Sequence, residues 1–346
     1  MFDRIPRCIV HVGMHKTGTT SIQSTLHSIK RRGDFTYMDL GDPNHSERVL
    51  NLFLDEPMKY RLNIRAGRDE LAVKRFNRRT VEMIETSVKR CETSNMIISA
   101  EGISLLSESE LMKMKEMLQL YFEKIEIVAY VREPASFMVS SLQQHIKAAS
   151  GIFYPETLYP GYRKRLKKFF DIFSRENVRL WRFGSSDIVK DFSSRLGFEI
   201  EEEEINSKNE TLTTEALSLL YIYRKYGPKY GKGRRSIQAN QNLIKALSFI
   251  GENKPRLSPS IVLPILERER KDIEWVEKRL GESLKTLPYP AGKRDIGKIE
   301  DLEKIDSKTI EDLNALLELH EVDMRIDPTA DREKIVTAID SLKEAL

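Results

Sequence analysis

Residues 8–21, Cys-Ile-Val-His-Val-Gly-Met-His-Lys-Thr-Gly-Thr-Thr-Ser, run from an apolar stretch into a loop of small residues. Beyond them Ile22, Leu26 and Ile29 recur at the spacing of one helix face. Glycines let backbone amides turn toward an anion, and a helix N-terminus adds donors and positive potential. We therefore predict a strand, a loop that holds a phosphate-like anion, and a helix; the alternative is an ordinary strand–turn–helix with incidental glycines.

The loop differs from the nucleotide-binding loop of ATPases. Gly13 and Gly18 have the spacing of that loop, in which a lysine follows the second glycine. In this chain Thr19 occupies that place, and the lysine comes earlier, at Lys16. The pattern thus favours an anion loop of another class.

Length and composition bound the fold and the partners. With 346 residues, 40% of them hydrophobic, the chain can form about two domains or one large domain with an appendage. Its net charge of +4 fits an anionic ligand and does not indicate a nucleic-acid partner. Two cysteines, Cys8 and Cys91, form neither a disulfide framework nor a metal-binding pattern, which indicates a reducing compartment.

The start of the chain lacks a signal-peptide pattern. No apolar run approaches the roughly 20 residues that a membrane span needs. From the sequence we expect a soluble, cytoplasmic protein with no transmembrane segment.

Strands and helices alternate over the first part of the chain. After the first strand and helix, strands are expected at 35–37, 96–100, 124–131 and 178–183, and helices at 46–54, 69–90, 109–122, 134–149, 162–173 and 186–196. Such alternation is typical of βαβ units. It predicts a three-layer α/β fold with a central parallel sheet and a P-loop-like first βα unit.

The pattern becomes helical after the acidic run at 201–204. Helices are expected at 213–226, 236–250, 260–280, 307–319 and 332–345. We expect an α/β core over residues 1–205 and a helical C-terminal part over 206–346 that packs on the core or caps it.

Three chemically different groups follow predicted strands: the loop from Gly13 to Ser21, the carboxylate of Glu101, and the guanidinium of Arg132. In open parallel sheets, ligands bind beyond the carboxyl ends of the strands. We therefore expect these groups to lie around one crevice.

Two of these elements resemble sulfotransferases that use 3′-phosphoadenosine 5′-phosphosulfate (PAPS). Members of that family carry a Lys-Gly-Thr loop, which binds the 5′-phosphosulfate, directly after the first strand. The stretch Arg132-Glu-Pro-Ala-Ser-Phe-Met-Val-Ser140 resembles their 3′-phosphate site, in which an arginine and a serine eight residues on grip the phosphate. The resemblance implies PAPS as co-substrate, no metal, and binding by Lys16, Thr17, Gly18, Thr19, Thr20, Ser21, Arg132 and Ser140.

The resemblance spans roughly Ile9 to Leu220, and the part from Phe170 to Leu212 looks like bacterial sulfotransferase-like proteins. It fades over the helical part. A late basic segment with glycine, which some relatives use as a second grip on the 3′-phosphate, is not evident. Residues 232–235, Lys-Gly-Arg-Arg, are a possible stand-in, although a solvated basic turn is the simpler interpretation.

Glu101 is the candidate general base. An acceptor hydroxyl loses its proton as it attacks, so a base within hydrogen-bond reach helps. The setting Met-Ile-Ile-Ser-Ala-Glu101 resembles that of the glutamate that fills this role in heparan-type sulfotransferases. The alternatives are that Glu101 caps a helix or pairs with a lysine, or that His15 or His145 is the base.

The expected function is therefore transfer of a sulfuryl group from PAPS to a hydroxyl. Lys16 would stabilise the departing bridging oxygen, and the family resemblance implies a sugar of a glycan or glycolipid as acceptor. An ATP-dependent kinase with a degenerate loop remains an alternative, in which Glu101 would hold magnesium. A nucleotide-binding protein without turnover is another.

Overall fold

The computed structural model describes residues 4–14, 16–148, 154–184, 187–206, 211–228, 234–284, 292 and 294–346. Contacts divide the chain into two compact units that alternate along the sequence. The α/β unit comprises Met1–Arg132, Gly161–Asn209 and Lys271–Leu284, and the helical unit comprises Glu133–Pro160, Glu210–Arg270 and Lys285–Leu346. The single boundary expected after residue 205 stays a prediction.

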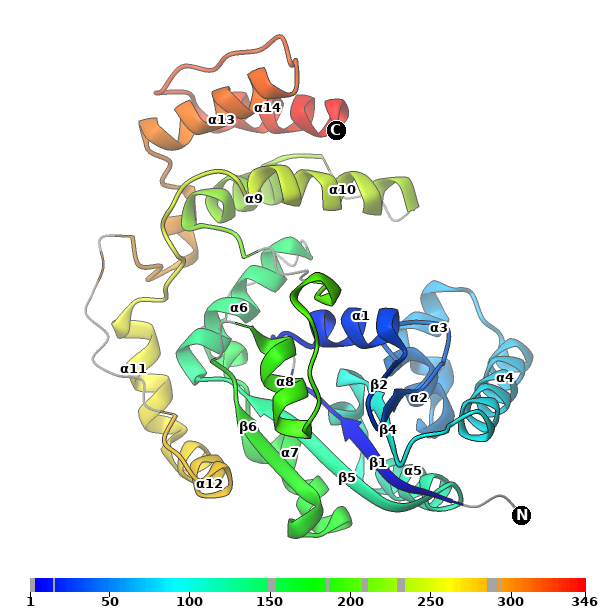
Figure 1. The fold of residues 1–346 in the computed structure, drawn as a ribbon. Coiled ribbons are helices and arrows are strands. Elements are labelled where there is room, and N and C mark those ends of the chain that lie inside the picture. The colour runs from blue at the N-terminus through cyan, green and yellow to red at the C-terminus, as the bar shows by residue number, and fades with distance from the viewer. Residues whose placement is uncertain are drawn as a thin grey trace. The chain divides into compact units, whose positions relative to one another are not determined.

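A six-stranded sheet forms the centre of the α/β unit (Figure 1). Its order is β2-β3-β4-β1-β5-β6, and β3, β4, β1, β5 and β6 pair in parallel. Only the short β2 is antiparallel, in a hairpin with β3 that the sequence did not predict. The α/β class is confirmed. The strand bounds are β1 Ile5–His11, β2 Arg31–Arg32, β3 Phe35–Tyr37, β4 Asn95–Ser99, β5 Phe122–Val131 and β6 Val178–Arg182.

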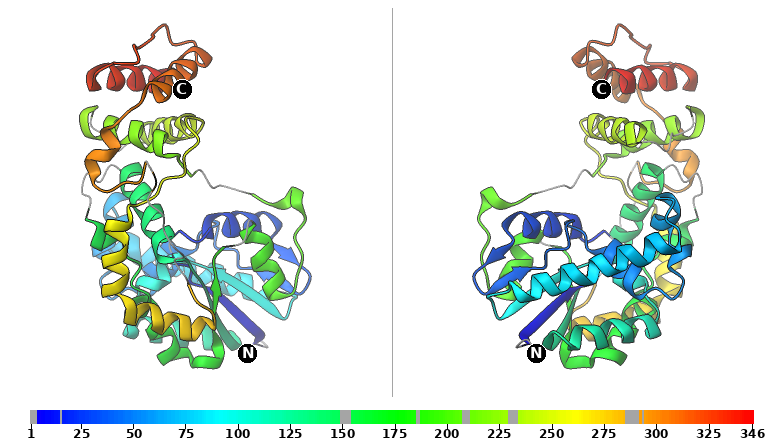
Figure 2. Two further views of the ribbon diagram at one scale, coloured as in Figure 1. Left: turned by 90° about the vertical axis from the view of Figure 1, so that its left-hand side faces the viewer. Right: turned by 90° about the vertical axis from the view of Figure 1, so that its right-hand side faces the viewer.

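Helices cover both faces of this sheet, which gives three layers (Figures 1 and 2). On one face α1 (Thr19–Ile29) and α8 (Ile188–Leu196) share an apolar cluster with Ile9 of β1. On the other, Val10 lines a small apolar cavity with residues of α2, α4 and α5. Adjacent residues of β1 thus serve opposite layers, as the period of a strand requires. The other helices of this unit are α2 Ser46–Phe53, α3 Arg61–Arg65, α4 Glu70–Lys89, α5 Glu108–Gln119, α7 Tyr162–Phe173 and α12 Arg270–Leu280.

Two expected helices differ from the structure. The helix expected to reach Phe122 ends at Gln119, because Phe122 begins β5 and pairs with Ile5 of β1. The helix expected over 260–280 is two helices, α11 (Pro259–Arg268) and α12. Tertiary contacts account for the break, since α11 packs into the helical unit whereas α12 binds α7.

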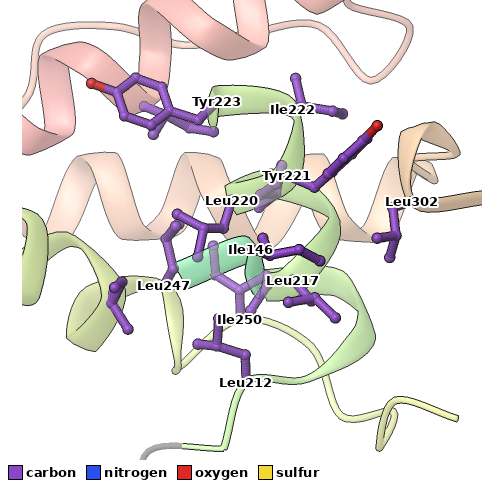
Figure 3. Close-up of a cluster of buried hydrophobic side chains, with 14 of the residues drawn as sticks. Ile146, Leu212, Leu217, Leu220, Tyr221, Ile222, Tyr223, Leu247, Ile250 and Leu302 are labelled. Atoms are coloured by element: carbon purple, nitrogen blue, oxygen red, sulfur yellow. The ribbon is translucent and has the colours of Figure 1, made fainter. Parts of the chain in front are cut away.

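One buried cluster of aliphatic and aromatic side chains holds the helical unit together (Figure 3). Helix α9 (Thr214–Tyr226) lies at its centre, and its residues from Thr214 to Tyr223 are all buried. A helix that is buried all round is typical of a core position. The surrounding helices are α6 Pro134–Lys147, α10 Arg234–Leu247, α11, α13 Ser307–Leu319 and α14 Arg332–Ala345.

Of the helices that the structure describes, none combines the length and apolar character that a bilayer crossing requires. Both cysteines are free thiols, and Cys8 is buried in β1. Within the described ranges, no group of three or more His, Cys, Asp or Glu side chains is placed to hold a metal ion.

Candidate functional site

In the loop between β1 and α1, three of the described residues have backbone angles in the left-handed region. The φ angles are +47° at Gly13, +70° at Lys16 and +71° at Gly18. Gly18 is also the N-cap of α1 and lies so close to Ile188 that an added Cβ would come within 2.7 Å of that side chain. For Lys16 this conformation costs roughly 1–2 kcal/mol, so surrounding contacts must hold it.

Arg132, at the end of β5, provides such a contact. Its Nη1 donates to the backbone oxygen of Lys16 at 2.7 Å. The backbone oxygen of Arg132 in turn accepts from the Tyr162 hydroxyl at 2.6 Å, and the guanidinium lies 5.1 Å from the ring centre of Phe183. The guanidinium therefore joins the end of β5 to the loop that follows β1.

Glu101 follows β4 and approaches the same loop. A Cβ built on Gly13 would lie 3.4 Å from the Cβ of Glu101 and 2.9 Å from Oγ1 of Thr19. The short helical turn from Glu101 to Leu105 is closed by a bond of 2.9 Å from the Ser104 hydroxyl to the backbone oxygen of Glu101. An added side chain at Gly13 would thus collide with Thr19, and the Cβ of Glu101 lies within van der Waals range of the same position.

Lys16, Glu101 and Arg132 also interact electrostatically. Partial burial lowers the pKa of Lys16, and Arg132 lowers it further, whereas the carboxylate of Glu101 opposes both. Charges act on one another in this way only over short distances. The structure therefore brings together, within the α/β unit, the three groups that the sequence placed at strand ends.

The hydroxyl residues of the loop have different surroundings. Thr17 is fully buried and donates to the backbone oxygen of Met14 at 2.6 Å, which closes the loop. Oγ1 of Thr19 is buried and has no hydrogen-bond partner among the residues described. Thr20 is exposed, and Ser21 is buried.

The first turn of α1 suits an anion. Its N-cap, Gly18, has no side chain that could cap the amides of this turn, and the amide of Ser21 donates to the backbone oxygen of Gly18 at 3.1 Å. Uncapped amides at a helix N-terminus bind phosphate and sulfate groups. The N-terminus of α1 and the adjacent Lys16 therefore provide the kinds of group that bind an anion.

Sequence reasoning missed the polar contacts beneath the loop, which centre on Ser99, the last residue of β4. The Oγ of Ser99 lies 2.8 Å from Nδ1 of His11 and accepts from Nε2 of Gln23 at 3.2 Å. Its backbone oxygen also accepts from Gln23 at 3.2 Å, and its amide donates to Nδ1 of His45 at 3.3 Å. All four residues are at most 2% exposed. The polarity of His11 and Ser99 inside apolar runs was the available signal.

The other residues considered for the site lie in the helical unit or outside the described residues. Ser140 and His145 lie on α6 in the helical unit, so the pairing of Ser140 with Arg132 stays a prediction. His15 lies outside the described residues, as do Lys232 and its neighbours. Arg235 is exposed on α10 of the helical unit.

Comparisons with known proteins add the following. No family model matches the chain, and no curated protein matches it. Among solved structures, the sulfotransferase from Alicyclobacillus acidocaldarius is 12% identical, with a TM-score of 0.42 over 80% of this chain and 96% of that one. A sulfotransferase domain from the curacin biosynthetic pathway is 12% identical, with a TM-score of 0.36 over 60% of this chain and 79% of that one. At this level of likeness, neither structure assigns a family or a substrate to this chain.

Proposed function

We propose that this protein is a sulfotransferase that moves a sulfuryl group from PAPS to a hydroxyl acceptor. One observation carries the proposal: Lys16, Glu101 and Arg132 are gathered at the uncapped, left-handed loop that follows β1. An anion cradle, a cation and a carboxylate are the three components that such a transfer needs.

The donor would be held at both of its phosphate ends. The amides from Thr17 to Ser21, with Lys16, would bind the 5′-phosphosulfate, and Arg132 with Ser140 would bind the 3′-phosphate. The guanidinium of Arg132 donates to the backbone oxygen of Lys16, and its planar set of five donors suits a phosphate group. No metal is required in this proposal.

The chemical step is an in-line displacement at sulfur. The acceptor oxygen forms a bond to sulfur while the bond from sulfur to the bridging oxygen breaks. The hydroxyl proton goes to Glu101, and the negative charge that develops on the departing oxygen is stabilised by Lys16 and the loop amides. The products are a sulfate ester and adenosine 3′,5′-bisphosphate.

The acceptor is proposed from family resemblance alone, as a sugar hydroxyl of a glycan or glycolipid. Incubation with radiolabelled PAPS and fractionated glycans or lipids identifies which fraction takes up label. Label in protein alone would contradict the sugar acceptor and leave the donor assignment standing.

Calorimetry with adenosine 3′,5′-bisphosphate, 5′-AMP and Mg-ATP tests the donor. The bisphosphate should bind at least about 10-fold more tightly than 5′-AMP, because a charge-assisted hydrogen bond contributes about 1.5–3 kcal/mol. Equal affinity for these two nucleotides would remove the 3′-phosphate assignment. A clear preference for Mg-ATP would favour the kinase, and tight binding without any transfer would favour a nucleotide-binding protein.

A further inference from the structure

Hydrogen bonds join Ser99 to α1 and to β1. The backbone oxygen of Ser99 only accepts, so the amide nitrogen of Gln23, and not its oxygen, must face Ser99. The same amide group donates its second proton to Oγ of Ser99. The Oγ of Ser99 also hydrogen-bonds to Nδ1 of His11 at 2.8 Å, and its side chain has a further hydrogen-bond partner in Tyr37.

His11 is the partner of Ser99 on β1. The ring is fully buried against Tyr130 and Phe192, and its Nε2 has no hydrogen-bond partner in the part of the chain that the structure describes. Burial lowers the pKa of His11 to about 4, although the carboxylate of Glu101 opposes this change. The His11 ring is thus uncharged near neutral pH.

The three residues belong to the three elements that carry the candidate site. His11 ends β1 and directly precedes the loop with Gly13 and Lys16. Ser99 ends β4, two residues before Glu101. Gln23 lies in α1, whose N-terminus forms the end of the loop.

We propose that Gln23, Ser99 and His11 form a positioning network that holds the anion loop and Glu101 in register for sulfuryl transfer. This inference rests on the proposed function. The three side chains act through the elements they join and need not contact the reactants. Small displacements of reacting groups cost rate steeply, whereas nucleotide affinity depends on charges that such displacements leave in place.

Ser99→Ala tests the network, because it removes the hydroxyl and leaves the backbone bonds of Ser99 to Gln23 and His45. We expect kcat to fall by about 10- to 100-fold, while the KM for PAPS and the affinity for adenosine 3′,5′-bisphosphate change by less than about 3-fold. Ser193→Ala is the matched control. Ser193 is 2% exposed on α8, and its hydroxyl donates to the backbone oxygen of Lys190 at 3.2 Å, away from the loop.

Gln23→Leu provides a second route should Ser99→Ala fail to fold. It conserves most of the side-chain volume and removes both bonds from α1 to Ser99. Since both substitutions remove the bond from Gln23 to Oγ of Ser99, the loss of rate in the double variant should be clearly smaller than the product of the two single losses. Additive losses in the double variant would contradict a shared network.

Nitrogen NMR of the His11 ring supplies a readout that does not require activity. At pH 7 it should show a neutral ring, and the Nδ1 resonance should shift in Ser99→Ala but not in Ser193→Ala. An active wild type with unchanged kcat in Ser99→Ala overturns the network alone. A wild type that neither binds the bisphosphate nor transfers sulfate overturns the proposed function, and the network's role with it.

Discussion

The two units bury polar groups in different places. In the α/β unit, buried polar side chains such as His11, Thr17 and Ser99 cluster where the strands end, beside the loop after β1. In the helical unit the interior is one aliphatic and aromatic cluster, and its shielded carboxylates are ion-paired with cations at the margin of that cluster.

The difference indicates what each unit contributes. Buried polar groups that converge on one loop stabilise that loop at the cost of apolar packing, and such a cost is typical of functional sites. Ion pairs at the margin of an apolar cluster orient helices. Substitutions in the first region should therefore change rates, and substitutions in the second should change stability alone.

Glu101→Gln should give the largest effect. The substitution keeps the shape of the side chain but removes the proton acceptor, so transfer should slow by roughly 10²–10⁴-fold. Affinity for adenosine 3′,5′-bisphosphate and the melting temperature should stay close to those of the wild type. Turnover at the wild-type rate would discard Glu101 as the base, and His15 and His145 would then be tested.

Lys16→Ala should give the second-largest effect. Turnover should fall by about 10²–10³-fold, because the lysine acts on charge that develops in the transition state. Binding of the bisphosphate product, measured by calorimetry, should weaken less than turnover does. A variant with normal turnover and only a raised Michaelis constant would show that Lys16 serves binding alone.

Mildly acidic pH should lower the stability of the α/β unit. Burial lowers the pKa of His11 to about 4 and that of His45 to about 3, from 6.5. Between pH 6.5 and 4 the unfolded chain therefore binds more protons than the folded one, and stability falls as the pH falls, by on the order of 3 kcal/mol per histidine. Urea unfolding at pH 7 and pH 4.5, followed by the fluorescence of Trp181 and Trp275, measures this change.

His11→Gln and His45→Gln test whether these two histidines cause the pH dependence of stability. Each removes one titrating ring, so each should flatten the dependence of stability on pH. A dependence as steep in both variants as in the wild type would assign it to carboxylates.

Gly18→Ala should destabilise the α/β unit by about 2–3 kcal/mol, since it combines a left-handed φ with a crowded position beside Ile188. Gly197→Ala is the matched control, because Gly197 has a φ of +88° but nothing within 4 Å of an added Cβ. Its cost should be nearer 1 kcal/mol. Equal losses of melting temperature would show that the contact with Ile188 does not constrain the loop.

Glu303→Gln should give the smallest effect, and only the stability of the protein should change. The Glu303 carboxylate is 7% exposed and pairs with Lys225 and Arg332, each at 2.6 Å. Loss of its charge should cost about 1–2 kcal/mol of stability, with sulfate transfer unchanged. Glu70→Gln, which breaks the exposed pair with Lys74, is the control and should have no measurable effect. A slower transfer rate in Glu303→Gln would break the contrast between the units.

The sequence by itself predicted the elements whose signals are local. Apolar runs, helical spacing and glycines lie within a few residues of one another, so the strand–loop–helix after Cys8 and the α/β class followed from them. The positions of Glu101 and Arg132 at strand ends also followed, because parallel strands share one carboxyl edge.

Only the tertiary structure determined the individual contacts between residues that are far apart in the sequence. The bond from Arg132 to the oxygen of Lys16 joins residues 116 positions apart, and that between His11 and Ser99 joins residues 88 apart. The break between α11 and α12 likewise arises because Asp272 binds amides at the start of α7, 110 residues away. Such contacts depend on how the layers pack, and neither spacing nor composition within one segment encodes them.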